Sequence, residues 1–576
     1  MRRMQRLLAR PAISGPLVSL AAMALAGGGC GTRRAGPPAD LVLHGGKVVT
    51  LDPARPEAEA IAVRDGAIVA VGSDGDVLAL AGDATRRIDL GGRMVLPGLT
   101  DAHGHIRSLG EQIDSLDVRG VASVEEVARQ VRARAAGMAP GDWVTGGGWD
   151  QNLWPGEKFP DHRPLSEAVP DRPVWLSRID GHASWANRKA MEAAGITRDT
   201  ADPPGGVIER DARGEPTGIF IDNAQDLVAA VQPKPTRQRI KAWIELALRR
   251  CAEAGLTSVH DAGVGEEEVA AFRELADEGR LPLRVYLMWS GIGGAYLSGA
   301  ATPFEDLLSR PPLVNYRDRL TLRAVKLMID GAMGSRGAMF FEDYADDPGN
   351  RGLPVMPPEA VEKAATLALA KGYQVCTHAI GDRGISLVLD AYEKALAASP
   401  AADPRMRIEH LQCVARGDVA RLKKMGVIAS MQPSHATSDM YWADERVGPE
   451  RGRGLYAWRW VLGDGVRLAA GSDFPVDPEK PLIGLQSAVT RQDLKRWPEG
   501  GWHPEQRMTL DEAIRAYTEG AAYAAFEEKT RGRIAPGYLA DLTVIAKDLR
   551  ALPPHEIAAA GIAYTIVGGV LAYEAP

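Results

Sequence analysis

The feature that most constrains the fold is a repeated alternation of helical segments with short apolar segments that end in polar residues. Helical segments end in glycine, the usual residue after a helix C-terminus, and lead directly into apolar runs, as residues 237–255 lead into 256–263. Apolar segments that end in polar residues number eight, at residues 95–103, 257–262, 283–290, 323–330, 374–379, 405–411, 427–434 and 466–473. Eight parallel strands with intervening helices predict a TIM-type (β/α)8 barrel.

The two ends of the chain differ from this middle section. Residues 40–95 and 530–576 contain short alternating apolar runs separated by turns, which indicate β-hairpins. We expect these ends to form one composite β-sandwich, while residues 96–111 and 236–529 form the barrel. Residues 112–235 do not follow the strand–helix rhythm and are too long for a loop. They predict an inserted α+β domain on the substrate side of the barrel.

The composition is that of an ordinary globular protein, with 45% hydrophobic and 25% charged residues among 576. The net charge is −7 and no basic run follows the N-terminal segment, so the chain lacks the electrostatic signature of a nucleic-acid-binding protein. Cys251, Cys376 and Cys413 are scattered and form no CxxC pair, which excludes a zinc ribbon and a thioredoxin-like motif. We therefore expect the hydrophobic core, rather than disulfides, to stabilise the fold.

The first 30 residues have the layout of a secretory signal. Four arginines among the first ten residues precede an apolar stretch at 12–26, and three glycines then lead to Cys30. The stretch is too short and too broken by Gly, Ser and Pro for a membrane span. A cysteine after small residues resembles a bacterial lipoprotein signal, with Cys30 as the lipid anchor; a plain signal peptide is the alternative. We expect residues 31–39 to be a tether. The protein is then exported to the periplasm or cell envelope, with the lipid as its membrane contact.

Side chains able to bind a metal end four of the eight predicted strands. His103 and His105 lie two residues apart, so both imidazoles point to one side of a strand. His378, His410 and Asp473 each end another apolar segment, and polar groups at the C-terminal ends of barrel strands face the active site. Alone, each is better explained as a buried hydrogen-bonded residue; together they predict a metal site. Nitrogen and oxygen ligands without thiolate suit Zn²⁺, Mn²⁺, Fe²⁺ or Co²⁺.

Lys326 adds a basic group to the same interior. It lies on the fourth predicted strand between Val325 and Leu327 and shares its inward face with Asp330. A buried ammonium beside cationic metals is unfavourable. Three arrangements relieve this: a lowered pKa, reaction with CO₂ to give a carbamate that bridges two metals, or pairing with Asp330.

Residues 97–105, 325–338, 377–382, 408–412, 431–435 and 471–476 carry, in this order, motifs of one known superfamily. They resemble the amidohydrolase superfamily, and most closely its amidohydrolase-3 branch of N-substituted formamide deformylase-like proteins. Residues 181–187, 205–219 and 256–263 also look like that branch. The resemblance covers nearly all of residues 40–576.

This resemblance implies a (β/α)8 barrel, a β-sandwich from both termini and one or two divalent metal ions, with Zn²⁺ expected first. The ligands carried over by motif fall into two groups: His103, His105 and Asp473 for one metal, and a carbamate on Lys326, His378 and His410 for the other. The implied reaction is hydrolysis of a non-peptide C–N bond, in an amide or an N-acyl or N-formyl amine. Metal-activated hydroxide is the expected nucleophile, and Asp473 is the expected proton shuttle.

Substrate choice is expected to depend on the strand-end loops and the inserted domain. The candidates for contact with a small-molecule substrate are Trp149, His182, Asp330, Arg336 and Gln432. The aromatic residue has a plain alternative in the core of the inserted domain, and Arg336 and Gln432 have one in loop packing.

Other functions remain open from the sequence. A cyclic amidase of the hydantoinase type keeps the same ligands. A mononuclear deaminase is less favoured. In such enzymes a glutamate follows the strand-5 histidine in an HxxE motif, whereas His378 is followed by Ala379-Ile380-Gly381. A related phosphoesterase is less favoured by the flanking motifs. From another class, a ligand-binding surface lipoprotein is the alternative, although it would have no reason to keep six metal-site residues. The sequence is compatible with a homo-oligomer.

Overall fold

A computed structural model describes residues 37–138, 141–290 and 304–576, and its centre is a barrel of eight parallel strands. The strands, in their order around the barrel, are β8 (Leu99–Gly104), β15 (Leu256–Val264), β16 (Arg284–Ser290), β18 (Leu320–Met328), β19 (Gln374–Ala379), β20 (Arg407–His410), β21 (Ile428–Met431) and β22 (Leu468–Ala470). Each lies within or across one of the predicted apolar segments. The prediction of a TIM-type barrel is therefore confirmed.

The barrel closes between its first and last strands. The backbone N–H of Asp473 donates to the carbonyl of His103 at 2.7 Å, and that of His105 donates to the carbonyl of Phe474 at 2.8 Å. Two glycines allow this approach. A Cβ at Gly104 would lie 2.5 Å from the Phe474 ring, and one at Gly471 would lie 2.6 Å from the His103 backbone nitrogen. The glycine between the two strand-1 histidines is thus required by packing.

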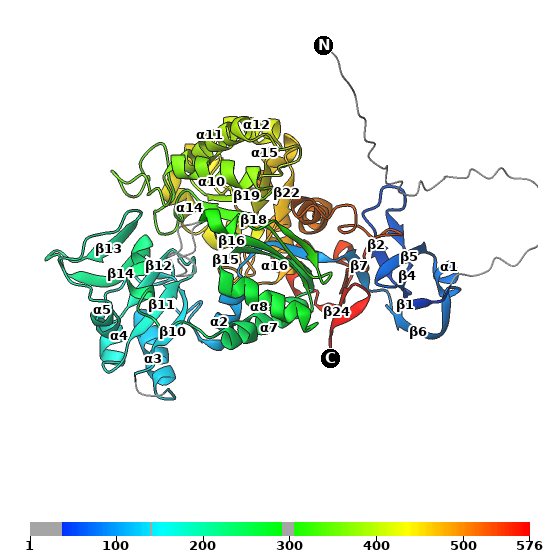
Figure 1. The fold of residues 1–576 in the computed structure, drawn as a ribbon, viewed down its shortest axis with the longest axis horizontal. Coiled ribbons are helices and arrows are strands. Elements are labelled where there is room, and N and C mark those ends of the chain that lie inside the picture. The colour runs from blue at the N-terminus through cyan, green and yellow to red at the C-terminus, as the bar shows by residue number, and fades with distance from the viewer. Residues whose placement is uncertain (1–36, 139–140, 291–303) are drawn as a thin grey trace, which may run out of the picture.

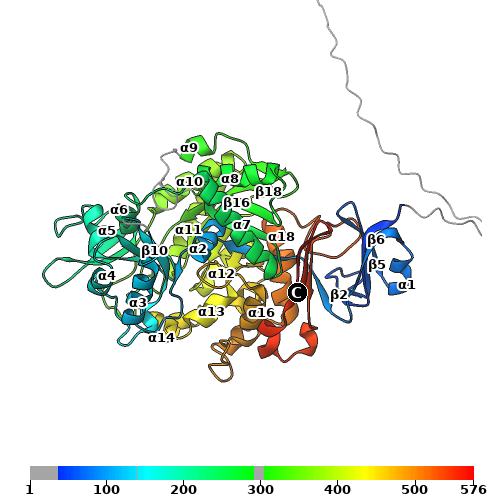
Figure 2. The same cartoon turned by 90° about the horizontal axis from the view of Figure 1, so that it is seen from below.

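Helices surround the barrel and cover the outer faces of its strands (Figures 1 and 2). The main ones are α2 (Ile106–Asp114), α7 (Arg237–Glu253), α8 (Glu266–Asp277), α10 (Pro358–Ala370), α11 (Asp382–Ala398), α12 (Arg416–Met425) and α16 (Pro481–Thr490). In α7 the Thr236 side chain accepts from the Arg239 N–H and caps the helix, and Ile240, Ile244 and Ala247 are buried, as their spacing predicts. The helix α12 ends at Gly426 with a φ of 66°.

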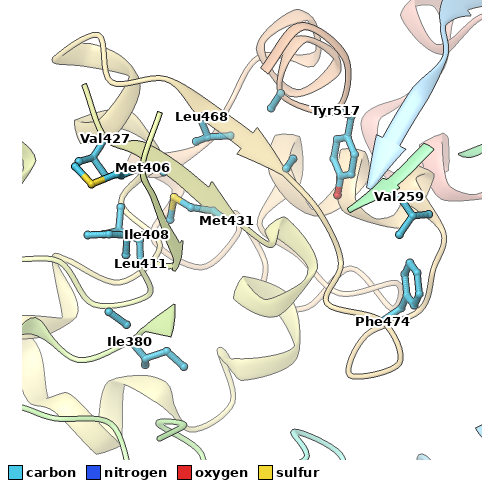
Figure 3. Packing of buried hydrophobic residues seen from close by; sticks show 14 of the residues in the cluster. Val259, Ile380, Met406, Ile408, Leu411, Val427, Met431, Leu468, Phe474 and Tyr517 are labelled. Atoms are coloured by element: carbon cyan, nitrogen blue, oxygen red, sulfur yellow. The ribbon is translucent and has the colours of Figure 1, made fainter. Parts of the chain in front are cut away.

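The main hydrophobic core lies between the strands and these helices. Figure 3 shows part of it, with Met406, Ile408 and Leu411 on the same side as Val427, and Phe474 below Val259. This core fixes the strand ends that carry the polar residues.

Two sheets lie beside the barrel, one built from the N-terminal part of the chain alone and one from both ends. One has the order β5-β4-β1-β6 and the other β25-β24-β23-β7-β2-β3. Their strands are β1 (Ala39–His44), β2 (Lys47–Val49), β3 (Glu57–Ala58), β4 (Ala60–Arg64), β5 (Ala67–Gly72), β6 (Ala81–Asp89), β7 (Met94–Pro97), β23 (Leu542–Ile545), β24 (Ile562–Val567) and β25 (Val570–Glu574). One apolar cluster joins them, and in Figure 1 the blue and red ends of the chain lie together.

The predicted strand at 95–103 is divided between this sandwich and the barrel, which corrects its boundary. The break falls at Gly98, where a Cβ would lie 2.2 Å from the Thr257 hydroxyl oxygen. The sandwich begins at Ala39, the last residue of the predicted tether.

Residues 112–235 contain a six-stranded mixed sheet of order β13-β14-β12-β11-β10-β9. Its strands are β9 (Leu116–Asp117), β10 (Val144–Trp149), β11 (Val174–Arg178), β12 (Ala183–Ala186), β13 (Gly206–Arg210) and β14 (Pro216–Asp222); the accompanying helices include α3 (Val124–Ala135), α4 (Arg163–Ala168) and α5 (Arg188–Ala193). This sheet, drawn in cyan and teal in Figure 1, lies across the barrel from the sandwich.

The signal segment, Cys30 and most of the predicted tether lie outside the described residues. Within the described ranges, no helix is long and apolar enough to cross a membrane. The cysteines Cys251, Cys376 and Cys413 are free and buried.

Candidate metal centre

The predicted ligands lie at the C-terminal ends of five barrel strands. His103 and Lys326 lie on β8 and β18, His378 and His410 on β19 and β20, and Asp473 follows β22. His410 and Asp473 have left-handed backbones, with φ of 76° and 59°. Such conformations are uncommon outside glycine and cluster at functional sites.

The carboxylate of Asp473 lies at the centre of the histidines. Its Oδ1 is 3.1 Å from Nε2 of His105 and 3.4 Å from Nε2 of His103, and its Oδ2 is 3.4 Å from Nε2 of His435. Burial alone would raise the Asp473 pKa, but the surrounding histidines hold it well below its ordinary value. Its Oδ1 is buried and forms no hydrogen bond within the described residues.

These donors fit a divalent metal ion. Two overlapping groups have ligand atoms within 4.8 Å of one another: His103, His105 and Asp473, and His410, His435 and Asp473. Burial lowers the pKa of His103 to about 4, and Lys326 contributes to that shift. Burial also holds the pKa of His410 well below its ordinary value. Neutral imidazoles at His103 and His410 and an ionised carboxylate oxygen without a hydrogen bond are the state that metal binding requires.

The histidines are oriented by acceptors at Nδ1. The Glu409 carboxylate lies 2.5 Å from Nδ1 of His103, the Asp477 carboxylate 2.7 Å from Nδ1 of His435, and the Gln432 amide oxygen 2.9 Å from Nδ1 of His410. A carboxylate only accepts hydrogen bonds, so it holds the proton on Nδ1. In His103 and His435 the other ring nitrogen, Nε2, then faces the Asp473 carboxylate.

Glu409, which contacts Nδ1 of His103, forms a buried ion pair with Arg407. The guanidinium of Arg407 contacts both carboxylate oxygens of Glu409, at 2.7 and 3.0 Å, and also donates to the Ala102 carbonyl and the Ser430 hydroxyl. Both charged side chains are fully buried. Burial alone would raise the Glu409 pKa, but Arg407 and His103 hold it well below its ordinary value.

Lys326 reaches into this cluster, with Nζ 3.4 Å from Nε2 of His103. Burial lowers its pKa. Asp330, which we expected as a partner of Lys326 or as a substrate contact, is engaged by backbone groups. Asp330 is fully buried, and its carboxylate accepts backbone N–H groups of Met339, Ile380 and Gly381 at 2.8–3.1 Å. It organises the loop after β18.

His378 lies apart from both donor groups. Its ring centroid is 4.5 Å from that of His410, but its Nε2 lies 3.7 Å from the Asp330 carboxylate and forms no hydrogen bond within the described chain. Burial, followed by the His410 charge, holds its pKa well below the ordinary value.

A cavity of about 450 Å³ opens above the centre between the barrel and the inserted sheet. His105, Lys326, His378, His410 and Asp473 line it, as does His182 from the inserted sheet.

Three other residues that we expected to contact the substrate do not line the cavity. Trp149 is fully buried in the inserted-domain core and donates to the Leu176 carbonyl. Arg336 does not line the cavity and pairs with Asp346. Gln432 is buried behind His410, which it orients.

Sequence reasoning missed His435, Glu409 and Asp101. His435 follows β21, so its place at the end of the seventh strand was a signal available in the sequence. Glu409 precedes His410 and reaches His103 across 306 residues of chain, a contact that no local pattern shows. Burial raises the pKa of Asp101 to about 7 although Ser472 donates to it.

The fold and this donor set define a barrel hydrolase that depends on a metal ion. The amidohydrolase family model matches residues 86–573, so the chain belongs to the amidohydrolase family. It is 34% identical to YtcJ of Bacillus subtilis over 92% of this chain and 99% of that protein. It is 28% identical to the N-substituted formamide deformylase of Arthrobacter pascens over 93% and 98% of the two chains.

A solved structure, of an uncharacterized metal-dependent hydrolase from Pyrococcus furiosus, is also similar. It has a TM-score of 0.68 and 28% identity, covering 88% of this chain and 99% of that one. The chain is therefore a metal-dependent hydrolase that acts on C–N bonds.

Proposed function

We propose that this hydrolase cleaves non-peptide amides, in particular N-acyl or N-formyl amines, and that Asp473 carries the proton from the nucleophile to the leaving nitrogen. The observation that supports this is the position of Asp473. One carboxylate oxygen faces His103 and His105, the other faces His435, and the group lines the cavity. The 28% identity to a formamide deformylase makes N-substituted formamides the first compounds to test.

The donors that would hold the metal are His103, His105 and Asp473, with Lys326, His378 and His410 as candidates for a second ion. A divalent ion bound there supplies Lewis acidity and brings the pKa of water towards about 7. The chain itself supplies the rest. Asp473 is ionised and buried, so it can accept a proton from attacking water and return it to the departing amine nitrogen.

We also propose that the Lys326 amine becomes a carbamate. Its lowered pKa favours the neutral amine, which adds to CO₂ to form an N–C bond and releases one proton. The product is an anion, which fits the histidine-rich surroundings and two cations better than an ammonium does.

Substitution of Asp473 tests the proton role. Asp473→Asn should leave a folded protein that keeps most of its metal, with kcat lower by at least about 100-fold on a cognate amide. The measurement is hydrolysis of N-formyl, N-acyl and cyclic amides by the zinc-supplemented protein, with metal content by mass spectrometry. His555→Ala, on the exterior, is the matched control. Full activity of the Asp473 variant would contradict the proposed role, and no turnover of any amide by the wild type would contradict the proposed reaction.

We propose that the protein acts on a small molecule outside the cytoplasm, anchored through a lipid on Cys30. The basic start, the apolar stretch and the cysteine after three glycines support this. Mass spectrometry of the mature N-terminus tests it. Diacylglyceryl Cys30 is expected, and a mature chain that retains residues 1–29 would contradict export.

A further inference from the structure

The inserted sheet contributes a histidine–carboxylate pair to the cavity. His182 precedes β12, Asp222 ends β14, and the two residues are joined by a backbone hydrogen bond of 2.9 Å from the Asp222 N–H to the His182 carbonyl. Their side chains also meet, with Nδ1 of His182 2.7 Å from Oδ1 of Asp222. His182 lines the cavity, and its ring centroid lies 5.3 Å from that of His378.

Asp222 is buried and has an unfavourable backbone conformation. It is fully buried, and its backbone has a φ of 47° with a ψ of −124°. Residues with a Cβ rarely adopt this combination, and such strain persists where the surrounding structure enforces it, often at functional sites. The second carboxylate oxygen, Oδ2, has no hydrogen-bond partner within the described residues. Burial of a carboxylate oxygen without a hydrogen bond costs free energy. Stability of the fold alone therefore does not explain this residue.

The barrel loop after β18 encloses this carboxylate. A Cβ at Gly331 would lie 2.8 Å from Oδ2 of Asp222, and one at Gly337 would lie 3.0 Å from it. The same two glycines are joined by a hydrogen bond from the Gly331 N–H to the Gly337 carbonyl. The loop that carries Asp330 is therefore shaped around Asp222, and the position of His182 is tied to the barrel.

The Nδ1 contact decides which edge of the His182 ring is available. A carboxylate only accepts, so it holds the Nδ1 proton, and Nε2 is left on the other side of the ring. Within the described chain no hydrogen bond occupies that nitrogen, and the side chain lines the cavity. His182 approaches from the inserted sheet, whereas the predicted ligands come from the barrel strands.

We propose that His182 touches the substrate's amide group as a catalytic residue and that Asp222 is its positioning residue. This rests on the proposed amide hydrolysis. The inserted sheet then completes the active site as well as enclosing it.

The test compares His182→Ala and Asp222→Asn with wild type and with the matched control His162→Ala. His162 is another histidine of the inserted domain; its Nδ1 lies 3.1 Å from the Ser166 hydroxyl, and it does not line the cavity. We expect His182→Ala to lower kcat/KM on an N-formyl amine by about 100-fold, with metal content unchanged. Asp222→Asn should lower it by at least about tenfold. Added imidazole should restore part of the His182→Ala activity, which a purely structural role would not allow.

Several outcomes overturn the proposal. One is a His182→Ala enzyme within threefold of the His162→Ala control, and another is a loss without imidazole rescue that is accompanied by loss of metal. An Asp222→Asn enzyme equal to wild type would overturn the positioning role. A wild type inactive on every amide would refute the proposed function instead.

A measurement without turnover completes the test. Diethyl pyrocarbonate should acylate His182 in the metal-loaded protein, as mapped by mass spectrometry, because Nε2 faces the cavity. An unmodified His182 would overturn the proposed geometry.

Discussion

Replacement of Glu409 by glutamine removes one charge from a fully buried pair and weakens the support of His103. Glu409 lies 2.5 Å from Nδ1 of His103 and contacts Arg407 at 2.7 and 3.0 Å. Breaking a buried pair by removing one partner costs about 3–5 kcal/mol. Arg407 keeps its bonds to Ala102 and Ser430, so we expect the lower end of that range. Loss of a carboxylate behind a metal-binding histidine lowers metal affinity by about 10–100-fold.

Two measurements check this prediction. Competition with a chelator gives the metal Kd, and urea denaturation of the metal-free protein gives the free energy of unfolding. The matched control is Glu528→Gln, whose carboxylate is 30% exposed and shares Arg405 with Asp403. A partly exposed pair of this kind contributes about 0–1 kcal/mol. If Glu409→Gln kept its metal Kd within threefold of wild type and unfolded like the control, the role assigned to Glu409 would be wrong.

Three other predictions follow from the same structure. Burial alone would raise the Asp541 pKa, but Arg284 and Arg531 lower it to about 2; its stabilising contribution is therefore present above about pH 4 and is lost as the pH falls towards 2. At pH 7 the Asp541→Asn variant should unfold at a lower urea concentration than wild type, and this difference in midpoint should become smaller below pH 4. A difference that does not change with pH would contradict the prediction. Lys326→Met removes a buried amine, so the metal-free protein should be at least as stable, while bound metal falls by mass spectrometry; unchanged metal would contradict the carbamate. Chelation should abolish hydrolysis and lower Tm, since saturation at 1,000 times Kd contributes about 4 kcal/mol; an unchanged Tm would contradict metal binding in the folded state.

The barrel was predictable because its signal is local. Each strand lies in an apolar run that ends in polar residues, and β15, β19, β21 and β22 directly follow helices that end in glycine. The strand β19 (Gln374–Ala379) matches its predicted range. The boundary between β7 and β8 was not predictable, since it depends on Gly98 fitting against Thr257, which lies on a different strand. Barrel closure likewise depends on Gly104 and Gly471, whose close contacts lie at opposite ends of the barrel sequence.

Most of the expected substrate contacts do not line the cavity, for a physical reason. An aromatic residue in an inserted domain buries its ring wherever a core is available, and Trp149 does so against Trp154 and Trp185. By alternation Asp330 shares the inward face of its strand with Lys326. Its carboxylate nevertheless accepts hydrogen bonds from three backbone N–H groups of neighbouring loops. Alternation predicts the direction of a side chain and does not predict its partner.

The orientation of the histidines is the part of the site that depends most on distant contacts. His103, His182 and His435 each place Nδ1 against a carboxylate that is 306, 40 and 42 residues away in the chain. Each carboxylate selects which nitrogen faces Asp473 or the cavity. A chain could therefore keep every predicted ligand and still present the wrong nitrogen if these acceptors were lost. The carboxylates behind the histidines are thus as necessary to the proposed chemistry as the histidines, and Glu409→Gln and Asp222→Asn test this at two independent positions.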